Sequence, residues 1–245
     1  MSQTVVIERR FNGPPDSGNG GYTCGLLARE IDGVAEVTLR RPPPLEVELH
    51  LAADDGDRME LRDGDAVVAE GIAAGTNRLE EPPGTVSLAE ARAAAARSTY
   101  LDEGTHPFPT CFVCGPLRDA VDGLRIFPGR VDGRNLFACP WTPEEGGDDV
   151  PVEIVWAALD CPTSAPLMNA PGPDGKVLPI VLARLAVDVR GAIRAGAEHV
   201  ITSWEIGREG RKREAGAALY GPGGDEPLAV ARALWIELRP EAAGG

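Results

Sequence analysis

The sequence has little positive charge. Lysine occurs only at Lys176 and Lys212, and Asp and Glu outnumber Lys and Arg by 38 to 24, so the 245 residues carry a formal net charge of −14. Binding to a nucleic acid or to an anionic membrane surface requires clustered Lys and Arg side chains. We therefore expect neither partner. The scarcity of lysine and the abundance of Ala, Gly and Pro are typical of a GC-rich bacterial gene.

Long apolar runs and a secretion signal are also missing. No run of about 18 apolar residues occurs, so the sequence predicts no membrane-spanning helix. Residues 1–11 lack the basic segment followed by an apolar segment that forms a signal peptide. Cysteine occurs only five times, an odd number that does not suggest a secreted disulfide framework. We expect a cytoplasmic protein.

Several catalytic motifs are absent. The chain has no Gly-x-Ser-x-Gly sequence, which argues against a serine hydrolase of the α/β-hydrolase type. It also has neither a P-loop nor a dinucleotide-binding fingerprint. We predict that the protein uses no cofactor.

Residues 17–28 are rich in glycine. Gly18, Gly20 and Gly21 surround Asn19 and lead into an apolar run. Glycine lets the backbone approach a ligand closely, and free N–H groups at the start of a helix favour an anion or a polarised carbonyl. The same pattern is typical of an ordinary turn, and these residues alone leave both interpretations open.

Three segments have helical patterns. Residues 22–31 form one, although Gly25 lowers its helix propensity by about 1 kcal/mol. Ser87 and Glu90 have the spacing of a capping box and predict a helix over residues 87–98. Residues 152–168 are apolar and predict a helix that breaks near Pro162.

Ten segments have the composition of strands. They are residues 4–9, 35–40, 45–52, 57–61, 66–74, 135–141, 181–189, 199–208, 211–220 and 228–238. Each half of the chain thus has a strand, a loop, a helix and then about four antiparallel strands. This order predicts an α+β protein in which a curved antiparallel sheet wraps around a central helix, twice. We place the first repeat at residues 1–78, a linker helix and a Pro- and Cys-rich loop at 79–130, the second repeat at 131–240 and a tail at 241–245.

The order resembles the hot-dog fold of acyl-CoA thioesterases and dehydratases, here as two tandem hot-dog folds that form a pseudo-dimer within one chain. Asn19-Gly20-Gly21 is similar to the His/Asn-Gly-Gly opening of the central helix in thioesterases of the phenylacetate-pathway type. In that family the glycine N–H groups bind the thioester carbonyl, and an acidic residue further along carries out hydrolysis. The Asp-x-Asn-Pro-x-x-His pattern of hot-dog hydratases is absent, which argues against a dehydratase.

The resemblance also implies one composite site. Residues 151–160 match residues 19–28 at the same spacing, so the second half has Asp160 where the first has Ala28. The central helices of hot-dog dimers run antiparallel, which implies that Asn19, Gly20 and Gly21 meet Asp160. The other site would combine Ala28 with Val152 and Glu153 and would lack the acid. For Glu153, capping of the helix start is the other interpretation.

We therefore predict Asp160 and Asn19 as catalytic residues, and Gly20, Gly21, Tyr22 and Trp156 as substrate-binding residues. Backbone N–H donors at a helix start stabilise an oxyanion by about 3–4 kcal/mol. An aspartate within an apolar helix is costly to bury without a partner, and it is suited to act as a base or a nucleophile. The other interpretation is that Asp160 hydrogen-bonds to loop backbone beside residues 161–163.

The cysteines offer a weaker pattern. Cys111 and Cys114 form a Cys-x-x-Cys pair, and with Cys139 and His106 they provide the four ligands of a zinc site. The spacing is irregular and no second pair occurs, so we predict no metal and expect these cysteines to be small buried groups in an ordered linker. A structural zinc protein remains an alternative.

The sequence thus predicts a hydrolase for an acyl-CoA or related acyl thioester, with a small molecule as its partner. A non-catalytic module that binds acyl groups or small ligands is the alternative, because each half lacks one part of the expected site. A homodimer of pseudo-dimers is one assembly that the resemblance implies.

Overall fold

The computed structural model describes residues 3–53, 58–119, 121–144, 148–168 and 179–238. The strands among them are β1 (Gln3–Val6), β2 (Ala35–Leu39), β3 (Glu48–Ala53), β4 (Arg58–Asp63), β5 (Ala66–Ala73), β6 (Gly129–Arg130), β7 (Phe137–Trp141), β8 (Ile180–Val189), β9 (His199–Glu209), β10 (Lys212–Tyr220) and β11 (Pro227–Glu237). Every predicted strand is present within a few residues of its expected ends, and β6 is an addition. The predicted tail, residues 241–245, lies outside the described residues.

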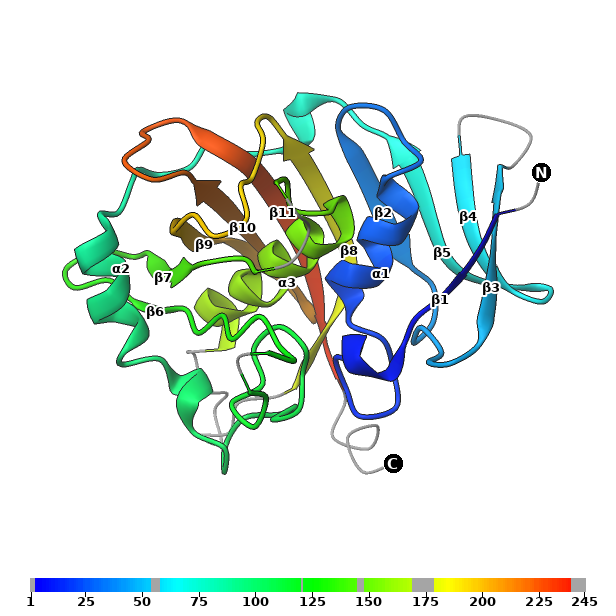
Figure 1. The fold of residues 1–245 in the computed structure, drawn as a ribbon, viewed down its shortest axis with the longest axis horizontal. Helices are drawn as coiled ribbons and strands as arrows, with labels where there is room; N and C mark the ends of the chain where they lie inside the picture. Colours follow the sequence, from blue (N-terminus) through cyan, green and yellow to red (C-terminus); the bar gives the residue numbers. More distant parts are fainter. Residues whose placement is uncertain (1–2, 54–57, 120, 145–147, 169–178, 239–245) are drawn as a thin grey trace.

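These strands form one antiparallel sheet with the order β1-β3-β4-β5-β2-β8-β11-β10-β9-β7-β6 (Figure 1). The order β1-β3-β4-β5-β2 in the first half is repeated as β7-β9-β10-β11-β8 in the second. The halves join through β2 and β8, where Ala35 pairs with Val187 and Thr38 with Arg184. The predicted α+β class with a large antiparallel sheet is confirmed.

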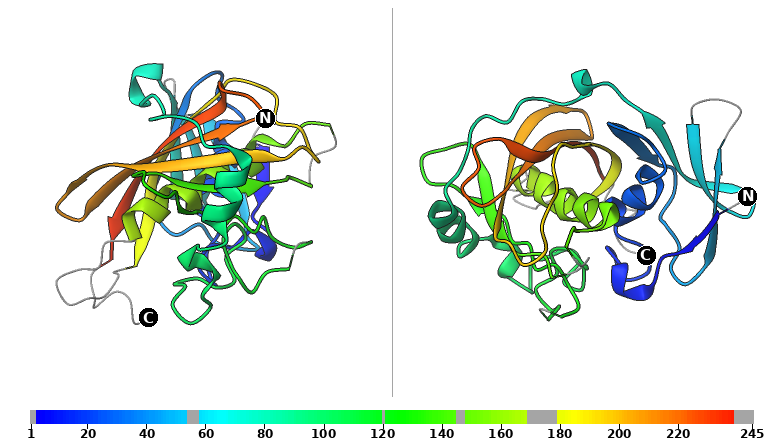
Figure 2. Two further views of the ribbon diagram at one scale, coloured as in Figure 1. Left: turned by 90° about the vertical axis from the view of Figure 1, so that its left-hand side faces the viewer. Right: turned by 45° about the horizontal axis from the view of Figure 1, so that its top comes forward.

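Three α-helices accompany the sheet in the described part of the chain: α1 (Gly20–Ala28), α2 (Leu88–Ala95) and α3 (Val152–Met168). Short 3₁₀ helices are at Arg9–Phe11, Thr76–Arg78 and Thr99–Leu101. The sheet curves around α1 and α3, which lie side by side, while α2 packs near β7 (Figure 2). No helix in the described segments is long and apolar enough to cross a membrane.

Capping explains where α1 and α2 begin. Asn19 accepts a hydrogen bond from the Tyr22 N–H at 2.8 Å, so α1 starts at Gly20, two residues before the predicted start. The capping box of Ser87 and Glu90 is confirmed, and each of the two residues bonds the backbone N–H of the other.

The predicted break in α3 near Pro162 is wrong. The helix runs unbroken through Pro162 and Pro166, although an interior proline costs about 3 kcal/mol. Almost all of α3 is buried, so packing against the sheet and α1 outweighs this cost. Two hydroxyl groups also bond backbone carbonyls in this region: Thr163 donates to the Asp160 oxygen at 2.6 Å and Ser164 to the Cys161 oxygen at 2.8 Å.

Two glycines let α1 and α3 touch backbone to backbone. A Cβ atom at Gly21 would lie 2.4 Å from the Asp160 Cβ, and one at Gly25 would lie 2.4 Å from the Glu153 Cα. Gly21 contacts Asp160, whereas Gly25, four residues later in α1, contacts Glu153, which is earlier in α3. The two helices are therefore antiparallel. The Gly25 that weakens α1 in isolation is therefore required by this close contact.

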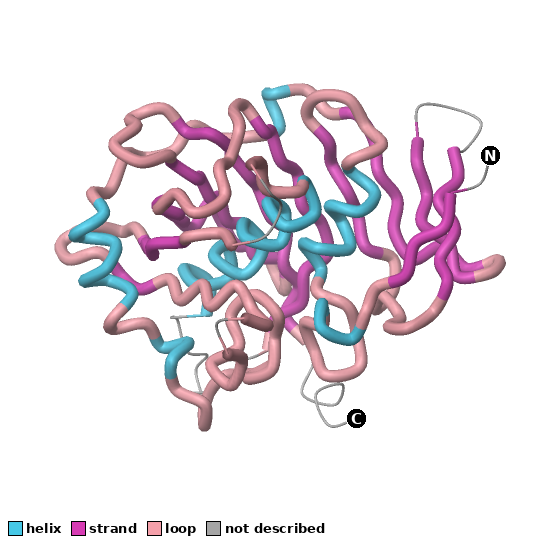
Figure 3. Tube along the Cα trace, in the orientation of Figure 1, coloured by secondary structure: helices cyan, strands magenta, loops and turns pink. Residues whose placement is uncertain are grey.

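The linker between α2 and β7 is mainly loop and packs beside α3 (Figure 3). Tyr100 and Phe112 of this segment are buried in the same core as both helices. A smaller buried cluster lies between α2 and the sheet and includes Ala91, Ala94 and Trp204. One continuous sheet and a shared core therefore position the two helices, and the repeat boundaries drawn from the sequence stay predictions.

Candidate active site

The N-terminus of α1 meets the middle of α3 at Asp160. The Asn19 Nδ2 donates to the Asp160 Oδ2 at 3.0 Å, and the Gly21 N–H donates to the same oxygen at 2.9 Å. Asn19 and Asp160 are each only 2% exposed. The structure therefore brings together three of the predicted site residues, with Asp160 about 140 positions beyond Asn19 and Gly21 in the sequence.

Local structure fixes the orientation of the Asn19 amide. Its oxygen caps α1 by accepting the Tyr22 N–H, so its nitrogen points away from that bond and toward Asp160. The backbone before the helix is held as well, because the Asn19 N–H donates to the Phe11 oxygen and the Gly18 N–H to the Pro43 oxygen. One asparagine thus both starts α1 and binds the carboxylate.

The two oxygens of Asp160 have different surroundings. Oδ2 accepts two hydrogen bonds, whereas the buried Oδ1 has no hydrogen-bond partner among the described residues. Burial raises the pKa of Asp160 to about 7, and nearby Cys111 adds to the rise, while the bonds from Gly21 and Asn19 act in the opposite direction. The arrangement anchors one oxygen and leaves the other with unused lone pairs.

The backbone N–H groups of the two glycines differ in their partners. The Gly21 N–H is occupied by Asp160, so in this structure it is not free to bind a thioester carbonyl. Gly20 is the first residue of α1, so no carbonyl within the helix can accept its N–H. This N–H has no other partner in the described segments. Gly20 also lies against β8, since a Cβ there would be 2.8 Å from a methyl group of Leu182.

Tyr22 and Trp156 are packing residues in this structure. Tyr22 is 7% exposed and stacks on Phe11 with ring centroids 4.0 Å apart. Trp156 is 2% exposed and lies one helical turn before Asp160, on the face that contacts Gly21 and Gly25. Their roles in binding a substrate stay predictions.

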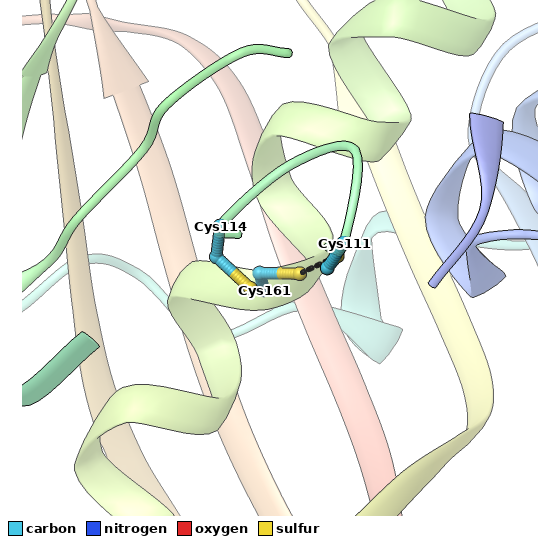
Figure 4. A group of neighbouring side chains, drawn as sticks. All are labelled: Cys111, Cys114 and Cys161. Carbon is cyan, nitrogen blue, oxygen red and sulfur yellow. Dashed lines mark hydrogen bonds between the residues drawn. The ribbon is translucent and has the colours of Figure 1, made fainter. Parts of the chain in front are cut away.

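A cluster of three thiols lies beside the carboxylate. The Sγ atoms of Cys111, Cys114 and Cys161 are all within 4.8 Å of one another and all three residues are buried (Figure 4). Contacts with the thiols of Cys114 and Cys161 lower the pKa of Cys111 well below its ordinary value. The contact with Cys111, together with burial, raises the pKa values of Cys114 and Cys161 well above theirs.

The structure does not bring together all four of the weak ligand candidates considered from the sequence. Cys139 lies on β7, and neither it nor His106 belongs to the three-thiol group. The His106 Nδ1 instead accepts the Phe108 N–H at 3.0 Å. Cys161 takes part although it was not among the ligand candidates, and the available signal was its position next to Asp160.

Comparison with solved structures gives the same architecture over nearly the whole chain. The tesB protein of Mycobacterium avium subspecies paratuberculosis aligns over 97% of this chain and 93% of its own, at 12% identity and a TM-score of 0.62. TesB2 of Mycobacterium marinum, an acyl-CoA thioesterase II, aligns over 91% and 90%, at 12% identity and a TM-score of 0.58. An Alicyclobacillus acidocaldarius protein described as having a hot dog fold aligns over 98% and 94%, at 11% identity and a TM-score of 0.57. The chain has the hot-dog fold.

The resemblance drawn from the sequence is therefore confirmed at the level of the fold. A scan against protein-family models finds no match, and neither does a search of curated proteins.

In this hot-dog protein, further side chains hold the segment of α3 that carries Asp160. Thr163 donates to the Asp160 backbone oxygen and accepts the Trp235 Nε1–H at 2.8 Å. The Tyr100 hydroxyl bonds to Ser164. These contacts have no local signal in the sequence, because they join α3 to β11 and to the linker, far away in the chain.

The opposite end of the helix pair has different groups. Glu153, near the start of α3, lies 3.8 Å from the guanidinium of Arg29, just beyond α1. Ala28 is buried at the position that matches Asp160. The hot-dog fold therefore presents an amide and a carboxylate at one end of its helix pair and a surface ion pair at the other.

Proposed function

We propose that this chain hydrolyses an acyl-CoA or a related acyl thioester at one composite site between α1 and α3. In this proposal the two halves are hot-dog units of an internal pseudo-dimer, consistent with the repeated strand order. The observation that carries the proposal is the state of Asp160, a buried carboxylate with one oxygen anchored by Asn19 and Gly21 and the other without a partner among the described groups.

The chemistry requires few groups. As a base, the Asp160 Oδ1 takes a proton from a water molecule while the water oxygen bonds to the thioester carbon. As a nucleophile, the same oxygen attacks that carbon, and water then hydrolyses the resulting anhydride. In both routes the C–S bond breaks when the tetrahedral intermediate collapses, and the thiolate leaves and is protonated.

We assign the oxyanion donor to the Gly20 N–H rather than to that of Gly21. Gly21 already donates to Asp160, whereas the Gly20 N–H is the unpaired donor in the described first turn of α1. A donor of this kind contributes about 3–4 kcal/mol to the transition state. Asn19 then keeps the carboxylate in place, and it orients the substrate only through Asp160.

The second candidate is a non-catalytic module that binds acyl groups or small ligands. The bond between the Gly21 N–H and Asp160 favours it, because this bond removes one of the two carbonyl donors that the resemblance implies. The predicted cytoplasmic location and the homodimer stay predictions under either candidate.

A screen of acyl-CoA substrates of different chain lengths, followed by release of free thiol, tests the proposal. We expect turnover by the wild type and a loss of about 10²- to 10⁴-fold in kcat for Asp160→Asn. The matched control is Glu153→Gln, which changes a carboxylate of α3 outside the site and should leave kcat unchanged. Undiminished turnover by Asp160→Asn would exclude the mechanism, and ligand binding without turnover by the wild type would favour the binding module.

A further inference from the structure

The three-thiol cluster joins two segments that the sequence keeps 50 residues apart. Cys111 and Cys114 lie in the linker loop, and Cys161 lies in the middle of α3 (Figure 4). Their sulfur atoms converge on one buried point, and the Sγ atoms of Cys111 and Cys161 are 3.8 Å apart. Convergence of three sulfurs on one point is an arrangement that suits a thiophilic metal ion.

The distances suit tetrahedral coordination. Zinc–sulfur bonds of about 2.3 Å place two sulfurs of a tetrahedral site about 3.8 Å apart. The Cys111–Cys161 distance already has this value, and the remaining pairs lie within 4.8 Å. Shifts of about 1 Å or less, within reach of side-chain rotation, would bring all three sulfurs to zinc–sulfur distance.

The linker loop has the turn of a metal-binding Cys-x-x-Cys segment. The Gly115 N–H closes the turn on the Cys111 oxygen at 2.9 Å, which places Cys111 and Cys114 on one tight turn. Gly115 is required there, since a Cβ would lie 2.5 Å from that oxygen. The chain thus holds Cys111 and Cys114 toward the same point before any metal binds.

A side-chain amide lies beside two of the three sulfurs. The Asn19 Nδ2 lies 4.0 Å from the Cys111 Sγ and 3.9 Å from the Cys161 Sγ, close enough to donate to a thiolate. The unpartnered Oδ1 of Asp160 belongs to the residue next to Cys161. Donors to ligating sulfurs are typical of outer shells in metal sites.

We propose that Cys111, Cys114 and Cys161 bind one Zn²⁺ ion, with the fourth coordination position taken by a ligand from outside the protein, such as water or a small thiol. Three protein ligands with one open position are the pattern of zinc sites that bind exogenous ligands. This site differs from the Cys111, Cys114, Cys139 and His106 set considered from the sequence, and it does not depend on the proposed thioesterase activity.

Metal analysis of the purified full-length protein tests the proposal. We expect about one zinc ion per chain in the wild type and release of that ion when a mercurial reagent modifies the thiols. Cys114→Ala and Cys161→Ala should reduce the zinc content to near zero. Cys139→Ala is the matched control, because Cys139 is equally buried but lies outside the group, and it should keep its zinc.

Anaerobic titration of the metal-free wild type with Co²⁺ keeps the test decisive if the variants fail to fold. Three thiolate ligands should give an intense sulfur-to-cobalt charge-transfer band that Zn²⁺ abolishes. Failure of the wild type to bind either ion would overturn the proposal. A mass lower by two hydrogens, with a Cys111–Cys161 disulfide in peptide maps of freshly isolated protein, would also overturn it and indicate a redox pair.

Discussion

The two ends of the α1–α3 helix pair carry different polar side chains, although the two helices pack closely through a glycine at both ends. At each end a glycine of α1 touches the backbone or Cβ of α3, Gly21 near Asp160 and Gly25 near Glu153. Only the first end has a buried carboxylate held by an amide and a backbone N–H. The second has an ion pair that is about a quarter exposed.

This difference distinguishes residues that are required for helix packing from residues that form a candidate site. Close packing of antiparallel helices requires small residues at both ends, so glycine alone indicates packing. Burying a carboxylate costs free energy unless its charge is compensated by hydrogen bonds, such as the two that Asp160 accepts. The described residues around Glu153 contain no equivalent buried carboxylate. In the proposed function, Asp160 and Asn19 therefore mark the site, whereas the contacts of Gly21 and Gly25 with α3 are explained by helix packing.

The largest expected effect comes from adding one methyl group to α1. In Gly21→Ala the Cβ would lie 2.4 Å from the Asp160 Cβ and 2.6 Å from the Trp156 oxygen, so the helices must separate. Overpacking of this kind costs about 1–3 kcal/mol or more, and separation also lengthens the bond to Asp160. We expect a lower midpoint in chemical denaturation and loss of both turnover and ligand binding.

Gly25→Ala is the matched control for this change. Its Cβ would meet the Glu153 Cα at 2.4 Å, so a similar loss of stability is expected. At temperatures where the variant is still folded, however, it should keep more activity than Gly21→Ala. Equal activity in the two variants would contradict the distinction between the two ends.

The next effect concerns the double role of Asn19. Asn19→Ala removes both the cap of α1 and the bond to Asp160, which should cost about 1–2 kcal/mol in unfolding free energy. Asn19→Ser keeps a capping hydroxyl but has no amide nitrogen to reach Asp160, so it should restore most of the stability and not the activity. Recovery of activity in Asn19→Ser would show that the contact with Asp160 is unimportant.

Where β11 holds α3, we expect a loss of stability of similar size but a smaller effect on activity, because the side chain of Asp160 keeps its own bonds. Thr163→Val keeps the shape of the side chain but leaves the buried Trp235 Nε1–H without its acceptor. A lost buried hydrogen bond of this kind costs about 1–3 kcal/mol. Thermal unfolding should show the loss, and Thr163→Ser, which keeps the hydroxyl, should not. If valine and serine behave alike, the hydroxyl does not position α3.

The sequence was sufficient for much of this site because the two halves repeat. Equal spacing in residues 19–28 and 151–160 predicted that Asn19 and Gly21 lie near Asp160 once it was combined with the antiparallel central helices that the resemblance to hot-dog proteins implies. The capping residues Asn19 and Ser87 could also be read locally, because a cap acts within one helical turn.

Other features depend on contacts that no local pattern encodes. The break at Pro162 was expected from propensity, yet burial of α3 on both the sheet and α1 overrides it. The Gly21 N–H binds Asp160 only because the helices approach so closely. Cys161 joins the Cys-x-x-Cys loop because the linker folds back across α3, a path set by tertiary packing.

The smallest effect is expected at the opposite end, from the pair of Arg29 and Glu153. Their nearest charged atoms are 3.8 Å apart and both side chains are partly exposed, so solvent and salt screen the attraction. A double-mutant cycle with Arg29→Ala and Glu153→Ala should give a coupling energy of at most about 0.5 kcal/mol. Activity should be unchanged throughout the cycle. A coupling several times larger, or a loss of turnover, would mean that this end also contributes to a site and that the asymmetry of the helix pair is less complete than its geometry indicates.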